Sequence, residues 1–156
     1  QRDKFWSEKL GIEGFTPRMG LQMLGTESGR DVFGDALWIS GVEKRWDSLG
    51  RPNMVITDCR YPNEIEMVKT LGGTIWLVTR GNDPEWYQDM YFHNAGESDD
   101  EDKRLIRQMR ATGDIPHESE TAWIGTDYDE IIRNDGSIEE LVERVSVLTK
   151  RIDTNN

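Results

Sequence analysis

The sequence has one cysteine, an excess of acidic over basic residues and no long apolar run. Its single cysteine, Cys59, cannot form an internal disulfide. Thirty acidic against nineteen basic residues give a net charge of −11, which repels nucleic acid backbones and anionic membrane surfaces. No apolar run approaches the roughly 18 residues of a membrane-spanning helix, and no signal-peptide pattern occurs. The sequence therefore predicts a cytoplasmic protein with neither a nucleic acid polymer nor a membrane as partner.

The apolar segments that are present predict an α/β fold in a single domain over residues 1–156. With 156 residues and 35% hydrophobic content, the chain can bury a core. Short apolar runs predict parallel strands at 53–58, 74–79 and 130–133. Amphipathic patterns predict helices at 62–71, closed by Gly72-Gly73, and at 137–152. The second of these helices begins with a capping box, Ser137 and Glu140, after the turn Asn134-Asp135-Gly136.

The stretch from Thr16 to Arg30 predicts a helix with one unusually bare face. Thr16 followed by Pro17 is a helix start, since threonine caps free N–H groups and proline is tolerated at the first helical position. On a 3.6-residue repeat, an inward stripe contains Leu21, Met23 and Leu24. The other face carries Arg18, Gln22, Gly25, Thr26 and Gly29. Interior glycine costs roughly 1 kcal/mol relative to alanine, so we expect a ligand on this face.

A long polar segment, 81–129, separates the second and third expected strands, and loops of this length are usually functional or disordered. An acidic run at 97–102 precedes basic residues, which suits a helix dipole. Lys103, Arg107 and Arg110 share one helical face, and two interpretations stay open. The face either closes on phosphates or is simply solvated.

Four motifs in a fixed order resemble those of the bacteriophage deoxynucleoside monophosphate kinases. They are T-P-R-x-x-L-Q-x-L-G-T-E-x-G-R at 16–30, T-D-C-R-Y-P-N-E at 57–64, H-E-S-E at 117–120 and N-D-G-S-I-E-E-L at 134–141. The resemblance implies a P-loop kinase fold, with a three-layer parallel sheet between helices. It implies transfer of the terminal phosphate of ATP, with Mg²⁺, onto a deoxynucleoside monophosphate in the cytoplasm of the phage host.

One element of the family is absent from the sequence. P-loop kinases hold the ATP phosphates with G-x-x-x-x-G-K-[ST], and this chain contains no Gly-Lys dipeptide. The resemblance implies an incomplete fold that lacks the first strand, the P-loop and the first helix. A missing N-terminal segment or a second chain would supply them, and a homo-oligomer is a further option. Alternatively the loop is lost, leaving a non-catalytic nucleotide-binding or subunit-contact module. We expect the isolated chain to be inactive.

Residue type and position, together with the resemblance, predict roles for particular residues, although Arg18, Arg30 and Gln22 could instead be ordinary surface residues. Substrate binding is assigned to Thr16, Arg18, Gln22, Gly25, Thr26, Glu27 and Arg30. Catalytic contacts are assigned to Asp58, Arg60 and Arg80, with Asp58 also the magnesium ligand. Asp58 could instead cap the following helix, and Arg60 could pair with Asp58 or Glu64.

A lid is expected at 81–120, and a loop beside the base of ATP is expected after the last strand. Charge and position after the second strand assign the lid to Arg104, Arg107, Arg110, His117, Ser119 and Glu120. The closing strand, turn and helix also resemble the end of dephospho-coenzyme A kinases, and that resemblance assigns the base-side loop to Asn134, Asp135 and Gly136. His117 and Glu120 are expected to close the site rather than to perform acid–base chemistry, because a lone histidine is more often structural.

Overall fold

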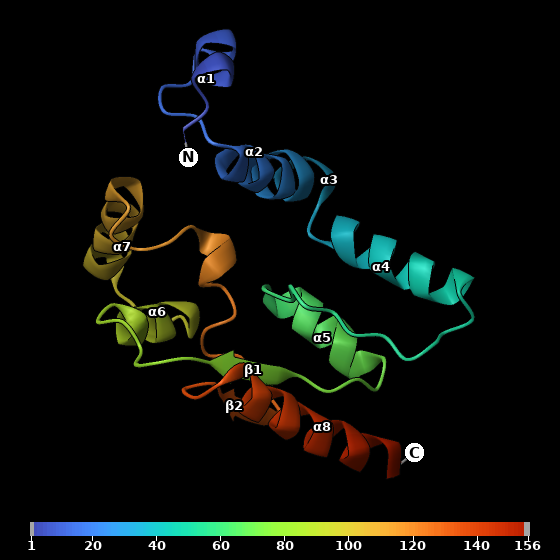
Figure 1. The fold of residues 1–156 in the computed structure, drawn as a ribbon. Coiled ribbons are helices and arrows are strands. Elements are labelled where there is room, and N and C mark those ends of the chain that lie inside the picture. The colour runs from blue at the N-terminus through green and yellow to red at the C-terminus, as the bar shows by residue number, and fades with distance from the viewer. Residues whose placement is uncertain (1, 155–156) are drawn as a thin grey trace. The chain divides into compact units, whose positions relative to one another are not determined.

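The computed structural model describes residues 2–154, and the side chains as far as residue 150. The chain divides into two compact units, Gln1–Glu64 and Ile65–Asn156, so that the division falls early in α5 (Pro62–Thr70). Both units are drawn in Figure 1. None of the helices within residues 2–154 combines the length and the apolar character needed to cross a bilayer.

The first unit is entirely helical in its regular structure. Its elements are α1 (Lys4–Leu10), α2 (Pro17–Met23), the π-helix η1 (Leu24–Arg30), α3 (Asp31–Phe33) and α4 (Ala36–Ser48). The expected helix start at Thr16 is confirmed, since its side chain accepts a hydrogen bond from the backbone N–H of Met19 at 3.0 Å. Helix α2 then continues directly into η1 and α3.

The expected inward stripe of this helix is wrong. Leu21 is 70% exposed and Leu24 is 60% exposed, whereas Gly29 and Arg30 are buried. One physical reason is the change from α2 to η1, because a π-helix has a wider turn and a 3.6-residue repeat does not continue through it. The second reason is packing, because the polar face contacts two aromatic side chains, Trp38 and Tyr61.

The second unit contains a small parallel sheet. Strands β1 (Trp76–Thr79) and β2 (Glu130–Arg133) pair in the register Trp76↔Glu130 to Thr79↔Arg133. Both were expected from the sequence, and the fold combines helices with a small parallel sheet of these two strands. The expected strand at 53–58 is wrong, because this segment pairs with no strand and Val55 is 85% exposed. An apolar run becomes a strand only where another backbone satisfies its N–H and C=O groups.

Two predicted helices are confirmed with their ends. Helix α5 is followed by Gly72-Gly73, where the N–H of Gly73 donates to the carbonyl of Val68 at 2.8 Å. Helix α8 (Ile138–Thr154) begins with the expected capping box. The N–H of Glu140 donates to Ser137 Oγ at 3.2 Å, and the N–H of Ser137 donates to Glu140 Oε2 at 3.0 Å. Figure 1 shows α8 running beside the sheet.

The long polar segment between β1 and β2 folds into a helical insertion, which we define as residues 81–129. It contains α6 (Tyr87–Asn94), α7 (Asp100–Thr112) and the 3₁₀-helix η2 (Glu118–Glu120). A small apolar core holds these elements together and consists of Met90, Ile106, Ile115 and Ile124. The acidic run provides a capping box at the start of α7, where Asp99 and Asp102 bond reciprocally.

Candidate functional site

The first unit is organised around a buried arginine, and we call its surroundings the Arg30 cluster. The cluster consists of Thr26, Arg30, Asp35, Tyr61, Asn63 and Glu64. The side chain of Arg30 is 5% exposed, and its guanidinium lies 3.7 Å from the ring centroid of Tyr61. One amino group forms a charge-assisted hydrogen bond with Glu64, and the other donates at 3.4 Å to the Asn63 side chain and the Asp35 carbonyl. A buried charge is thus stabilised by an opposite charge, an amide and an aromatic face.

Glu64 connects this arginine to the loop before α5. Its second carboxylate oxygen accepts hydrogen bonds from the backbone N–H groups of Arg60, at 2.7 Å, and Tyr61, at 3.1 Å. The hydroxyl groups of Tyr61 and Thr26 lie 3.1 Å apart. Two sequence motifs that are far apart in the chain, at 16–30 and 57–64, therefore meet in one hydrogen-bonded cluster.

The other predicted substrate-binding residues lie around or beside this cluster. Arg18 and Glu27 are exposed, and Gln22 is half-buried. Thr16 caps α2, as described above. The carbonyl of Gly25 accepts a hydrogen bond from Trp38 Nε1 at 2.9 Å, while the space where a Gly25 side chain would project is open. Of the predicted residues, Thr26 and Arg30 are those whose side chains form the cluster.

Asp58, the predicted magnesium ligand, is an exposed carboxylate. It lies close enough to Cys59 to help raise the pKa of that thiol to about 11, after burial and Glu64. A protonated thiol is neither a nucleophile nor a metal ligand at neutral pH. No group of three potential metal ligands occurs among the residues that the structure describes. A single carboxylate can hold Mg²⁺ where substrate phosphates and water complete the coordination.

The predicted catalytic Arg80 and the predicted base-side loop come together at one edge of the sheet. Arg80 follows β1, and Asn134, Asp135 and Gly136 follow β2. The N–H of Asn134 donates to the carbonyl of Thr79 at 2.8 Å, and the N–H of Gly81 donates to the Asp135 carboxylate at 2.8 Å. Because parallel strands end at the same edge, both segments are placed where open α/β sheets bind ligands.

The predicted lid arginines do not act as one group. Arg110 is half-buried and donates to the Thr121 hydroxyl at 3.0 Å, inside the helical insertion. Arg107 is exposed, and its Nε donates to the carbonyl of Lys103 on its own helix at 3.2 Å. Arg104 is exposed on the same helix. The cations that helix α7 leaves exposed are therefore Lys103, Arg104 and Arg107.

The H-E-S-E motif forms η2 and its cap. His117 Nδ1 lies 3.0 Å from the hydroxyl of the buried Ser119 and accepts from the Ser119 backbone N–H at 3.2 Å. The carbonyl of Glu120 accepts a hydrogen bond from Trp123 Nε1 at 2.9 Å. These contacts hold the end of the helical insertion together.

The sequence reasoning did not identify His93. Burial lowers the pKa of His93, and the cations Arg110 and Lys103 lower it further, with Glu118 acting in the opposite direction. Its Nδ1 is buried without a hydrogen-bond partner, as is Nε of Arg110. A single histidine within a short helix carries no periodic or motif signal that could have revealed this environment.

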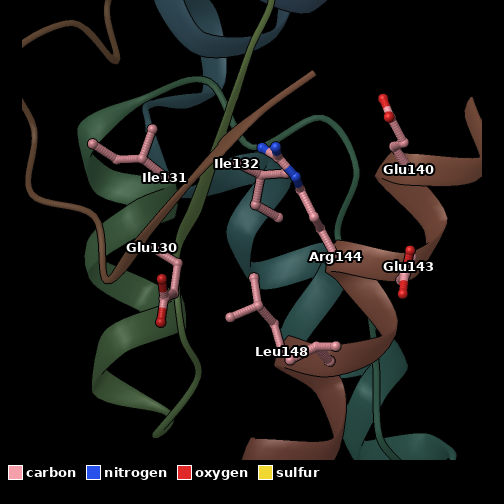
Figure 2. A pocket seen from close by; sticks show the side chains of 8 residues that line it. Glu130, Ile131, Ile132, Glu140, Glu143, Arg144 and Leu148 are labelled. Atoms are coloured by element: carbon pink, nitrogen blue, oxygen red, sulfur yellow. The ribbon is translucent and has the colours of Figure 1, made fainter. Parts of the chain in front are cut away.

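A hollow of about 440 Å³ lies between β2 and α8. Figure 2 shows Arg144 reaching from α8 towards the strand, where its guanidinium donates to the carbonyl of Arg133 at 2.7 Å. The apolar part includes Ile132 and Leu148, and the charged part includes Glu130, Glu140 and Glu143. Three carboxylates with one arginine that is already engaged disfavour phosphate at this place.

Comparison with protein-family models, with curated proteins and with solved structures gives no match for this chain.

Proposed function

We propose that this chain supplies the acceptor site, the lid and the base-side loop of an enzyme that transfers a phosphoryl group from ATP to a deoxynucleoside monophosphate. The observation that supports this most directly is the meeting of the 16–30 and 57–64 motifs in the Arg30 cluster. The resemblance assigns substrate and phosphate contacts to both motifs, and in the structure a side-chain network joins them.

Phosphoryl transfer depends mainly on positioning and on neutralising spread negative charge, so arginine matters more than a general base. In this proposal the exposed side chains of Arg18, Arg60 and Arg80 contact phosphates. Arg30 acts chiefly as a positioning residue, because its guanidinium is already engaged by Glu64 and a phosphate would have to compete for it. Mg²⁺ would be held by Asp58 together with the phosphates of ATP.

The proposal requires an ATP-phosphate loop from outside these 156 residues, in a further segment or on a second chain. We propose that the completed enzyme has the P-loop kinase fold, with a three-layer parallel sheet between helices. Exposed apolar side chains in the first unit, Leu21, Leu24, Val32 and Phe33, favour contact with such a segment. The same observation favours the second candidate function, a non-catalytic nucleotide-binding or subunit-contact module.

The experiment measures phosphate transfer from ATP to dGMP, dTMP and dCMP, first with this chain alone and then with a P-loop segment supplied. We expect no turnover alone. In the completed enzyme, Arg18→Ala should lower acceptor kcat/KM roughly ten- to a hundredfold, because hydrogen bonds to charged groups contribute about 1.5–3 kcal/mol. Gly25→Leu should raise the monophosphate KM by blocking the open face, with stability kept.

Lys44→Ala is the matched control, because Lys44 is an exposed cation of the same unit outside both motifs. Brisk turnover by the chain alone would contradict the requirement for a P-loop. Nucleotide binding without turnover in the completed complex would favour the non-catalytic module. Equal kinetics for Arg18→Ala, Gly25→Leu and Lys44→Ala would remove the acceptor site from the first unit.

A further inference from the structure

One edge of the small sheet in the second unit has no strand beside it. Among the described residues the sheet consists of β1 and β2, so β2 pairs on one side only. Glu130 and Asn134 donate their backbone N–H groups to carbonyls at the end of β1 or just before its start. The backbone N–H and C=O groups of successive strand residues point to opposite sides of the strand. Those of Ile131 and Arg133 therefore point away from β1.

A side chain of α8 satisfies one of these outward groups. The guanidinium of Arg144 donates to the carbonyl of Arg133 at 2.7 Å, and Figure 2 shows it reaching the strand. Within the part of the chain that the structure describes, the N–H and C=O of Ile131 and the N–H of Arg133 take part in no hydrogen bond. Ile131 is 56% exposed, so this edge is accessible. Unpaired edge groups are a template for another extended backbone.

The hollow of about 440 Å³ between β2 and α8 lies along this edge. Its apolar lining consists of Ile131 and Ile132 from β2 and of Val147 and Leu148 from α8. Val147 is 47% exposed, and Leu148 is half-buried. An added strand would run about 4.8 Å from β2, so the side chains on its α8 side would enter the hollow. We call the outward backbone groups of β2, together with this hollow, the β2 edge site.

The charges of the β2 edge site select the partner. Among the described residues, no hydrogen bond or ion pair involves the carboxylates of Glu130 and Glu143. Glu140 caps α8, and Arg144 is engaged at β2. A surface carboxylate does not define a site by itself, but here two of them line the hollow beside an open backbone edge. They attract Lys or Arg and repel an acidic segment.

A second copy of this chain is a poor occupant of the β2 edge site. Its net charge of −11 repels another copy, and pairing β2 with β2 would bring the same carboxylates together. The occupant that matches both the open backbone and the unpaired carboxylates is an extended segment of opposite charge.

We propose that the β2 edge site binds an extended, basic segment of a partner protein, which adds as a third strand beside β2. Ile131 and Arg133 supply backbone hydrogen bonds, in the manner of β-strand addition. An apolar side chain of the segment packs on the apolar lining of the hollow. A Lys or Arg two residues away on the same face of the segment lies near Glu130 and Glu143.

Arg144 limits the length of this pairing, because its guanidinium occupies the carbonyl of Arg133. A contact over so few residues is typical of weak, transient docking. The β2 edge site uses none of the residues of the proposed acceptor site, and a strand added at the opposite edge of the sheet, on β1, would leave it unchanged. The proposal is therefore independent of the phosphoryl transfer.

The test measures fluorescence anisotropy of the labelled peptide Lys-Val-Ile-Val-Lys, blocked at both ends, during titration with the 156-residue chain at physiological ionic strength. The peptide Glu-Val-Ile-Val-Glu reverses the charge. A third peptide keeps the lysines but has its central backbone nitrogens methylated, which removes the N–H groups that form a strand. We expect saturable binding of the first peptide alone. Equal binding of the methylated peptide would reduce the effect to charge attraction and overturn the proposal.

Ile131→Pro tests the backbone edge, because it removes an outward N–H and leaves the bonds to β1 in place. Proline is tolerated in an edge strand where the N–H faces outward. The affinity should fall roughly tenfold or more, since one hydrogen bond is lost and the ring blocks the approach. Thermal unfolding of the variant shows whether the fold is kept.

Glu143→Gln tests the charge and should weaken binding roughly two- to fivefold. Glu139→Gln is the matched control, because Glu139 is an exposed residue of α8 that does not line the hollow. Glu130→Lys combined with Glu143→Lys should transfer the preference to the Glu-Val-Ile-Val-Glu peptide. Equal affinity in Glu143→Gln and Glu139→Gln would overturn the assignment, even if Ile131→Pro does not fold.

Two further measurements identify a different occupant. A dimer in sedimentation that Ile131→Pro converts to a monomer would assign the edge to a second copy and overturn the proposal. Displacement of the peptide by the P-loop segment of the completed enzyme would assign the edge to that fold instead. Absence of saturable binding of the lysine peptide would also overturn the proposal, and would leave the phosphoryl-transfer proposal standing.

Discussion

The two units of the chain bury different kinds of side chain. Among the described residues of the first unit, only Gly29 and Arg30 are buried. The second unit buries mainly apolar side chains, namely Ile65, Met90, Ile106, Ile115, Ile124 and Ile132, together with the hydroxyl residues Ser98, Ser119 and Thr121. The first unit is thus organised by one paired charge, and the second by hydrophobic contact.

This difference predicts different responses to substitution. Apolar contacts are individually small and collectively large, so their loss is graded. A buried ion pair that loses one partner leaves an uncompensated charge, so its loss is abrupt. We therefore expect the largest single-residue effects on the first unit at Glu64 and Arg30, although neither residue is apolar.

Glu64→Ala should destabilise the first unit by roughly 3–5 kcal/mol, because it leaves the Arg30 guanidinium buried without its carboxylate. It also removes the acceptor of two backbone N–H groups before α5. Hydrogen exchange of the amides in η1 and α3 measures the free energy of local opening. Glu66→Ala is the control on the same helix, since Glu66 is exposed.

A double variant, Arg30→Met with Glu64→Leu, should recover part of the stability lost in Glu64→Ala. Equal protection in Glu64→Ala and Glu66→Ala would show that the cluster does not organise this unit.

Gly29→Ala and Gly25→Ala should change the folding stability in opposite directions. A side chain at Gly29 would lie 2.9 Å from the Trp38 ring and from the carbonyl of Leu24, whereas the space at Gly25 is open. Overpacking at Gly29 should cost about 1–3 kcal/mol. Alanine at Gly25 should stabilise by up to about 1 kcal/mol through helix propensity. Thermal unfolding of both variants checks this. A stabilised Gly29→Ala would mean that the close approach to Trp38 is not part of the fold.

The smallest expected effect concerns the titration of His93 in the second unit. The pKa of His93 is lowered in the folded chain, so the unfolded chain binds more protons and stability rises with pH. The stability that the neutral imidazole of His93 contributes should be fully present above the ordinary histidine pKa of about 6.5. It should be lost as pH falls from there towards the lowered pKa of His93 in the folded chain. The slope cannot exceed about 1.4 kcal/mol per pH unit for one proton, and solvent screening reduces it.

Denaturant unfolding of the wild-type chain and His93→Gln, compared between pH 5 and pH 8, measures that slope. The variant should lose the part of the pH dependence that arises from this imidazole. His117→Gln serves as the comparison for the second histidine of the chain. Parallel pH profiles for wild type and His93→Gln would show that His93 does not contribute.

The sequence predicted the features that depend on local chemistry. The structure has the predicted helix ends at Thr16, Pro17, Gly73, Ser137 and Glu140. These ends were predictable because they are marked by hydrogen bonds within a few residues. β1 and β2 were likewise recognisable, because each is a short apolar run bounded by polar residues.

What the sequence could not predict depends on distant partners or on a change of helical repeat. The exposure of Leu21 and Leu24 follows from the π-helix and from packing on Trp38 and Tyr61, and neither is visible in a 3.6-residue pattern. The run at 53–58 resembles β1 in composition, but a strand also needs a neighbour. In the candidate site, the engagement of Arg30 by Glu64 joins residues 34 apart in the chain.

The parallel pairing of β1 with β2 has a consequence for the order of folding. The hydrogen bonds that connect the strand ends join residues 54 apart in sequence, so the pairing must close a long loop, and such contacts form slowly. The contacts inside the helical insertion, such as that of Arg110 with Thr121, 11 residues apart, span shorter distances along the chain. An insertion that collapses first brings the two strands together and shortens the loop that remains to be closed. We therefore predict that the apolar core of the insertion speeds the formation of the sheet, in addition to stabilising the finished structure.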